Sequence, residues 1–276
     1  MARYTDGFWW NDGLRLHYRD YAGGADGRPV LLCLPGLTRN VRDFESLAER
    51  LAPAWRVIAV SFRGRGESAF SRNPTSYVPL IYVLDLQVLI RELGLTAFVP
   101  IGTSLGGLVT MLMAEAERER IKGVVLNDVG PELNQAGIDR IRSYVGRSAN
   151  WPTWLHAARA LAETQRAAYP DYKIDDWLRM AKRVYRLSAT GRIVLDYDTR
   201  IAEPMRSTAD QPPISTVAQP GPVMMPLGPG MGPTQLGWVV GSPTRAAGRP
   251  PIVTVAEPFA IIAGPPGTQG SVQGVV

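Results

Sequence analysis

The stretch Ala97-Phe-Val-Pro-Ile-Gly102-Thr-Ser104-Leu-Gly106 carries the strongest structural signal in the chain. A short apolar segment at 97–102 predicts a strand, and residues 104–116 have the spacing of a helix. Glycines at 102 and 106 leave room for a sharp turn between them, and such a turn exposes a serine hydroxyl at the carboxyl edge of a sheet. Ser104 is therefore a candidate nucleophile. The alternative is a structural Gly/Ser turn, because a Gly-x-Ser-x-Gly match alone is weak evidence.

Apolar runs and amphipathic segments alternate on both sides of this turn. Further strands are predicted at 30–34, 56–60 and 123–126, and further helices at 41–52 and 78–93. Residues 7–21 predict a hairpin around the Asn11-Asp12-Gly13 turn. Strands that alternate with helices at this spacing indicate an α/β fold with a mostly parallel sheet and helices on both faces.

Only helical spacing remains between residues 131 and 203, which predicts an all-helical insertion with helices at 136–145, 151–168 and 174–187. A helical insertion after a strand end is typical of a lid over a cleft, and the alternative is that it completes a core. Trp151 and Trp154 would line an apolar substrate pocket under such a lid. Together with Trp177 they could equally form the core of the insertion.

The composition changes near residue 205. Residues 206–276 contain 13 Pro and 11 Gly among 71 residues, and five charged side chains. We therefore expect three parts: a core at 1–130, a helical cap at 131–203 and an atypical Pro/Gly-rich segment at 204–276. Dense prolines predict mostly irregular chain there, although 251–255 could add a strand. A sheet edge left bare would favour self-association. A translated frameshift or an unrelated fused end would explain the change.

Charge and cysteine usage exclude several classes of function. The net charge is +5, and the 30 Arg and Lys residues are scattered among 25 acidic ones, which gives no basic patch for nucleic acid. The single cysteine, Cys33, excludes an internal disulfide and is expected in the core. The apolar run at 105–114 is about half of a membrane span, and the start has no apolar signal core. A cytoplasmic protein without a membrane span is expected.

Four motifs, in this order, resemble the α/β-hydrolase superfamily in its lid-bearing, esterase-like branch. The resemblance covers about residues 5–205, and its motifs are Pro35-Gly-Leu37, Phe62-Arg-Gly-Arg-Gly-Glu-Ser68, Gly102-Thr-Ser-Leu-Gly-Gly107 and Leu126-Asn-Asp-Val-Gly-Pro131. It implies Ser104 as nucleophile, the N–H groups of Leu37 and Leu105 as oxyanion hole, a small-molecule carboxylic ester as substrate, and neither cofactor nor metal. A serine at this turn disfavours haloalkane dehalogenase and epoxide hydrolase chemistry, which forms an ester on a carboxylate.

The sequence departs from this family where the general base should be. A serine needs a histidine oriented by a carboxylate, and the resemblance implies both in the last quarter of the chain, yet no histidine follows His156. His156, in a predicted cap helix, is one candidate base; a helical histidine with no catalytic role is the alternative. Asp128, after the strand at 123–126, is a candidate acid or a loop cap. His17, in the hairpin, is expected to pack.

Two functions remain open at this point. The first is a serine esterase weakened by the missing histidine. The second is a catalytically inert member of the family, or a frameshifted product. The loop 63–67 could suggest an anion site, but its arginines are expected to be solvated or paired with Asp43, Glu45 or Glu67.

Overall fold

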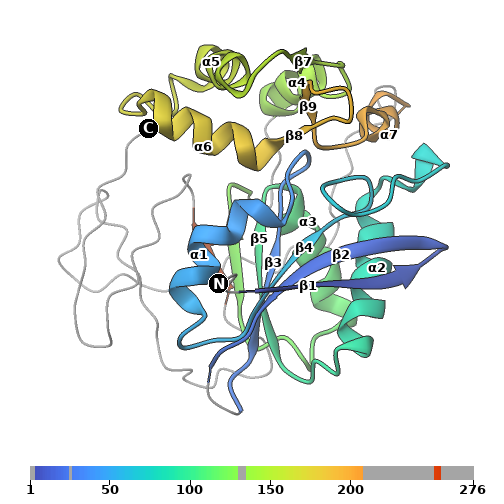
Figure 1. Cartoon of the computed structure of the whole chain (residues 1–276). Coiled ribbons are helices and arrows are strands. Elements are labelled where there is room, and N and C mark those ends of the chain that lie inside the picture. Colours follow the sequence, from blue (N-terminus) through green and yellow to red (C-terminus); the bar gives the residue numbers. More distant parts are fainter. Residues whose placement is uncertain (1–3, 25–26, 130–134, 208–251, 256–276) are drawn as a thin grey trace.

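A seven-stranded, mostly parallel sheet forms the centre of the computed structural model, which describes residues 4–24, 27–129, 135–207 and 252–255 (Figure 1). The strand order is β1-β2-β4-β3-β5-β6-β10. The hairpin strands β1 and β2 are antiparallel, and the strands from β4 to β10 run parallel. Their bounds are β1 (Thr5–Asn11), β2 (Leu14–Tyr21), β3 (Val30–Leu34), β4 (Val57–Ser61), β5 (Phe98–Thr103), β6 (Val124–Asn127) and β10 (Ile252–Val255).

Helices cover both faces of this sheet, as the alternating pattern predicts (Figure 1). Every residue of β3 is buried, and alternate residues belong to different apolar clusters. Leu32 and Leu34 pack with α2 (Pro79–Glu92) and α3 (Leu105–Ala116), whereas Cys33 packs with α1 (Glu45–Leu51) on the other face. The prediction that Cys33 lies in the core is confirmed. Short 3₁₀ helices η1 (Val41–Phe44) and η2 (Pro74–Ser76) complete this part of the chain.

Residues 135–195, here called the inserted segment, lie over the carboxyl ends of the parallel strands (Figure 1). The segment contains α4 (Gln135–Tyr144), α5 (Trp154–Gln165) and α6 (Ile174–Val184), with an antiparallel sheet of β7 (Asn150–Trp151), β9 (Ile193–Leu195) and β8 (Tyr185–Leu187). The prediction of an all-helical insertion is therefore wrong for 185–195. Strands this short show no periodicity, and they form because β8 and β9 pair with each other.

The chain leaves the inserted segment through η3 (Thr199–Ala202) and α7 (Glu203–Ser207). Beyond it, Ile252–Val255 adds β10 in parallel to β6, with Ile252 opposite Val124 and Val255 opposite Asn127. The possible strand at 251–255 is confirmed, and the expectation of a bare edge is wrong at β6, because the four residues of β10 hydrogen-bond to it. The rest of the predicted irregular tail falls outside the described residues, and the three-part domain division stays a prediction.

No helix in the described parts of the chain combines the length and the apolar character that crossing a membrane requires.

Candidate active site

Ser104 lies at a strained turn between β5 and α3. Its backbone has φ 50° and ψ −113°, a conformation that residues with a Cβ rarely adopt. The backbone N–H of Ser104 donates to the carbonyl of Asn127 at the end of β6, with an N···O distance of 2.8 Å. The residue is half-buried, so its hydroxyl is not enclosed by the core.

The glycines on either side of Ser104 allow this turn to form. A Cβ at Gly106 would stand 2.1 Å from the carbonyl oxygen of Leu34, and a Cβ at Gly102 would stand 2.4 Å from the carbonyl oxygen of Gly106. Both distances are far below van der Waals contact, and the clashing atoms belong to the backbone, which cannot move aside. Only glycine fits at these two positions, so the Gly-x-Ser-x-Gly pattern reflects the packing of the turn.

Two backbone segments bring N–H groups near this serine. Leu105 is the first residue of α3, where N–H groups have no partner inside the helix. The loop after β3 runs alongside the turn, since a Cβ on Gly36 would lie 3.9 Å from the Cβ of Ser104. Leu37, next in that loop, is half-buried. The two predicted oxyanion donors thus belong to the two segments that meet at Ser104.

Arg65 holds the loop that contains Leu37. Its Nε donates to the carbonyl oxygen of Leu37 at 2.8 Å, and its Nη1 donates to the carbonyl of Arg63 and the hydroxyl of Tyr82. This contact was missed by reasoning from the sequence. The local signal was an arginine between two glycines, Gly64 and Gly66, that both have positive φ.

The expectation that Arg63 and Arg65 are solvated or paired with Asp43, Glu45 or Glu67 is wrong. Both side chains are completely buried. Arg63 forms a bidentate ion pair with Asp85, with N···O distances of 2.8 and 2.7 Å. The loop turns inward because the chain at 196–198 hydrogen-bonds to its backbone at 64 and 66. Arg63 and the Nε and Nη1 groups of Arg65 therefore bind protein groups, and both side chains lie in the interior rather than at an open anion site.

Asp128 lies at the same edge of the sheet as Ser104. It follows Asn127, which pairs with Thr103 and accepts a hydrogen bond from the N–H of Ser104, so Asp128 and Ser104 each lie one residue beyond the same pair of the β5–β6 ladder. It is exposed, its φ is 54°, and desolvation raises the pKa of its carboxyl above the ordinary value. No hydrogen bond within the described residues joins the two side chains.

No contact within the described residues joins His156 to Ser104. It is exposed near the start of α5, and its Nδ1 lies 2.8 Å from Oγ1 of Thr153, the residue that caps this helix. Trp151 and Trp154 are half-buried against the apolar cluster of the inserted segment, and Trp151 packs on Tyr185 with ring centroids 4.4 Å apart. Trp177 is buried in the same cluster. The roles given to His156, Trp151 and Trp154 stay predictions.

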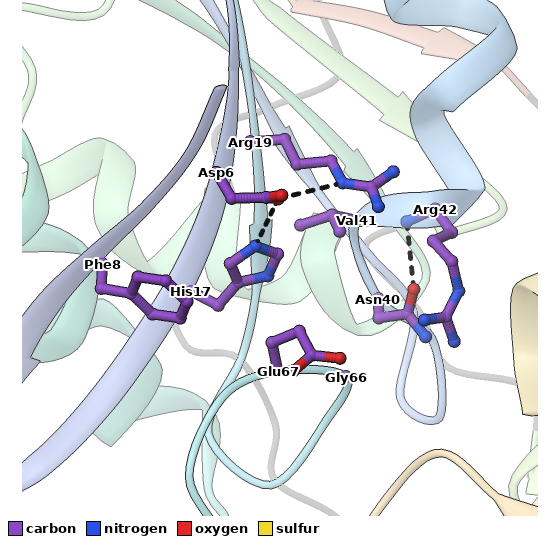
Figure 2. Close-up of a pocket in the computed structure, with 9 residues that line it drawn as sticks. All are labelled: Asp6, Phe8, His17, Arg19, Asn40, Val41, Arg42, Gly66 and Glu67. Carbon is purple, nitrogen blue, oxygen red and sulfur yellow. Dashed lines mark hydrogen bonds and ion pairs between the residues drawn. The ribbon is translucent and has the colours of Figure 1, made fainter. Parts of the chain in front are cut away.

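His17 packs inside the hairpin region, as expected. Its Nε2 lies 2.8 Å from a carboxylate oxygen of Asp6, its side chain is 2% exposed, and burial lowers its pKa, although the Asp6 carboxylate opposes this. Figure 2 shows the ring beside a surface hollow of about 340 Å³ that Arg19, Arg42 and other polar residues line. This hollow opens beside β1 and β2, whose strands are separated from β5 by β4 and β3 in the sheet. His17 is therefore engaged away from the serine turn.

Within the described residues, no group of three or more His, Cys, Asp and Glu side chains could hold a metal ion.

Comparison with known proteins places this site in a family. A model described as alpha/beta hydrolase fold matches residues 29–174, which include β3, the Leu37 loop and the Ser104 turn. The chain belongs to the alpha/beta hydrolase fold family. The mostly parallel sheet flanked by helices agrees with this membership.

Members of this family that resemble the chain include hydrolases. The 3-hydroxybutyrate-oligomer hydrolase of Cupriavidus necator is 30% identical over 200 residues, which are 71% of this chain and 68% of that protein. A crystal structure of an alpha/beta hydrolase from Novosphingobium aromaticivorans is 53% identical with a TM-score of 0.73, over 78% of this chain and 75% of the other. Epoxide hydrolase 4 of Mus musculus is 31% identical over 45% of this chain, and this match spans 34% of that protein.

Proposed function

We propose that this chain is a serine hydrolase that acts on carboxylic esters, with Ser104 as the nucleophile. The observation that supports this most directly is the strained backbone of Ser104 at the start of α3, between two glycines that no other residue can replace. Strained backbone of this kind clusters at functional sites. A serine on such a strand-to-helix turn has its hydroxyl exposed at the strand ends, where it can act as a nucleophile. Family membership supports hydrolysis in general, and a serine at the turn supports acyl transfer through an oxygen nucleophile.

The proposed reaction begins when Oγ of Ser104 attacks the ester carbonyl carbon and gives its proton to a base. The carbonyl oxygen becomes negative and is stabilised by the N–H groups of Leu37 and Leu105. The tetrahedral intermediate then expels the alcohol, which takes up a proton, and leaves an acyl group on the serine. Water attacks this acyl-enzyme in the same way and releases the acid. The step needs no cofactor or metal.

The identity of the base limits the expected rate. Asp128 is our candidate acid because it and Ser104 each lie one residue beyond the last pair of the β5–β6 ladder, and its raised pKa reflects loss of hydration at this edge. His156 makes no contact with Ser104 within the described residues and remains our candidate base. Serine hydrolases that lack a triad member lose several orders of magnitude in turnover but keep a residual rate from the oxyanion hole and binding. We therefore expect slow turnover, mainly of activated esters.

A specific observation also favours the second candidate, a catalytically inert member of the family. The chain has two histidines, and the structure places one against Asp6 and the other against Thr153. Neither contacts Ser104 within the described residues. An intact-mass measurement against the gene sequence would test whether the Pro/Gly-rich end is the product of a frameshift.

We further propose that the inserted segment acts as a cap over the strand ends. The support is its position in Figure 1, together with the hydrogen bonds that tie it to the core. Asn40 and Arg42, just after the Leu37 loop, both donate to the carbonyl of Arg183 on α6. The relative from Cupriavidus necator is named for hydrolysing 3-hydroxybutyrate oligomers, and we take esters of hydroxy acids as the first substrates to test.

A fluorophosphonate probe tests the proposed function directly. We expect covalent labelling of the folded protein and turnover of short activated esters, with both abolished in Ser104→Ala. Ser143→Ala, which removes an exposed serine of α4, is the matched control and should label normally. Absence of labelling on folded wild-type protein would favour the inert candidate. Full turnover by His156→Ala would eliminate His156 as the base.

A further inference from the structure

A hollow of about 180 Å³ lies between the loop that follows β3 and helix α6 of the inserted segment. The loop contributes Arg39, η1 contributes Asp43, and the remaining lining residues come from the inserted segment. These are Tyr169, Tyr172, Asp176, Arg179, Met180 and Arg183. None of them has a role in the proposed reaction.

The hollow and the nucleophile share a neighbour, Gly36, although Ser104 does not line the hollow. A Cβ placed on Gly36 would lie 3.5 Å from Cγ of Arg39 and 3.9 Å from Cβ of Ser104. The aliphatic stem of Arg39 and the side chain of Ser104 therefore approach the same glycine. A substrate whose ester carbonyl meets Ser104 can extend past Gly36 toward Arg39.

The guanidinium of Arg39 has capacity left for a ligand. Its Nε and Nη2 donate to the two carboxylate oxygens of Asp43, at 2.5 and 2.8 Å. Its Nη1 makes no hydrogen bond within the described part of the chain, where only Nε and Nη2 do, and the side chain is 28% exposed. Asp43 therefore orients the guanidinium and leaves its Nη1 group available to a ligand.

The charges around the hollow leave a net positive site. Asp43 is matched by Arg39, and Asp176 is matched by Arg179 and by the backbone N–H of Lys173. A third arginine, Arg183, has no carboxylate partner among the described residues, and its Nη2 donates to the hydroxyl of Ser46. Three guanidinium groups thus face two carboxylates that are already paired.

The aromatic wall of the hollow supplies neutral donors. The rings of Tyr169 and Tyr172 have centroids 4.6 Å apart. Burial raises the pKa of Tyr169, so its hydroxyl stays protonated at neutral pH and can donate to an anion. Met180 adds an apolar surface against which a short hydrocarbon chain can pack.

We propose that this hollow binds the carboxylate of an acidic ester, with Arg39 as the residue that selects it. The substrate class is then a carboxylic ester that carries a second, free carboxylate. This inference rests on the proposed function, since it names the substrate of the same site. A monoanion fits better than a dianion such as a phosphate monoester, because Asp43 and Asp176 also line the hollow and repel a second negative charge.

Binding is measured first, in a form of the protein that cannot turn over its ligand. In Ser104→Ala, we compare 4-acetoxybenzoate with its neutral methyl ester by titration calorimetry. We expect about tenfold to hundredfold tighter binding of the carboxylate, the effect of one charge-assisted hydrogen bond. Adding Arg39→Met and Asp43→Asn removes this preference while it keeps the net charge and leaves no unpaired carboxylate. Circular dichroism checks that the variant is folded.

An arginine–aspartate pair at the amino end of the parallel strands is the control. Arg56, just before β4, forms a similar bidentate pair with Asp20, with N···O distances from 2.7 to 3.3 Å. Arg56→Met with Asp20→Asn in the Ser104→Ala background makes the same pair of changes and should keep the full preference for the carboxylate. Equal affinity for the two ligands, or a preference that survives the loss of Arg39, would overturn the inference.

Turnover separates this inference from the proposed function. With Ser104 intact, the ratio of kcat/KM for the two acetoxybenzoates should fall about tenfold or more in the Arg39→Met/Asp43→Asn variant, through KM. A protein that binds the carboxylate selectively, but neither labels with a fluorophosphonate nor hydrolyses either ester, refutes the hydrolase and supports the anion site. A protein that hydrolyses both esters with equal kcat/KM refutes the anion site and supports the hydrolase.

Discussion

Replacing Ser104 with glycine should abolish activity and give a protein that is more stable than the Ser104→Ala variant. The turn holds the backbone at this position at φ 50° and ψ −113°, a conformation in which a Cβ is strained. Strain of this kind costs about 1 to 3 kcal/mol for a residue other than glycine. Ser104→Gly removes the Cβ and so removes the strain, whereas Ser104→Ala removes the hydroxyl and keeps the strain.

The expected gain is smaller than the strain, because glycine also makes the unfolded chain more flexible. That effect lowers the free energy of unfolding by about 0.5 to 1 kcal/mol relative to alanine. The difference leaves Ser104→Gly more stable than Ser104→Ala by about 1 kcal/mol. For a folded part of this size, such a difference corresponds to a Tm higher by about 2 to 4 °C.

Thermal and urea unfolding of the two variants and the wild type measure this difference. The control is the pair Ser143→Gly and Ser143→Ala on α4, where the backbone is helical and glycine should be the less stable substitution. We expect glycine to be the more stable of the two substitutions at Ser104 and the less stable one at Ser143. A Ser104→Gly variant that melts at or below Ser104→Ala would show that the turn stores no strain, and would remove the main support for a functional serine.

Two further predictions follow from buried groups. Arg65→Met should lower kcat about tenfold to hundredfold with little change in KM, because the Leu37 carbonyl loses its hydrogen bond to Arg65. The control is Arg63→Met in the same buried loop, which should destabilise the fold but leave kcat unchanged in the protein that remains folded. Equal losses of kcat in the two variants would contradict a positioning role for Arg65. His17 is held neutral, because burial lowers its pKa below 6.5 more than Asp6 raises it. The unfolded state therefore binds more protons than the folded state as the pH falls below about 6.5, so stability should decrease there, and His17→Gln should flatten this decrease in urea midpoints measured from pH 7.5 to 5. A His17→Gln variant with the wild-type pH dependence would contradict it.

Local patterns predicted most of the parallel core. The strand expected at 30–34 has those bounds in the structure, and the strand expected at 56–60 is displaced by one residue. The helix expected at 41–52 begins as a 3₁₀ turn, because the side chain of Asn40 accepts a hydrogen bond from the N–H of Arg42. These elements are predictable since each is a continuous run whose period matches its burial.

The inserted segment was less predictable. Its helices were expected near their observed positions, but β7, β8 and β9 were not expected at all. They have two or three residues each, and their stability comes from pairing between Trp151 and Ile193 and between Tyr185 and Leu195. The tilted contact between the rings of Trp151 and Tyr185 joins residues that are distant in the chain.

The sequence by itself determined the position of Ser104, because a sharp turn between a strand and a helix needs small residues at fixed local spacing. Only the tertiary structure decided what surrounds that serine. The anchor from Arg65 to Leu37 joins residues 28 positions apart, and the hollow at Arg39 is closed by α6, far along the chain. A buried arginine and an exposed one have the same side chain, and only the folded surroundings decide whether its donors meet a carbonyl, a carboxylate or a ligand.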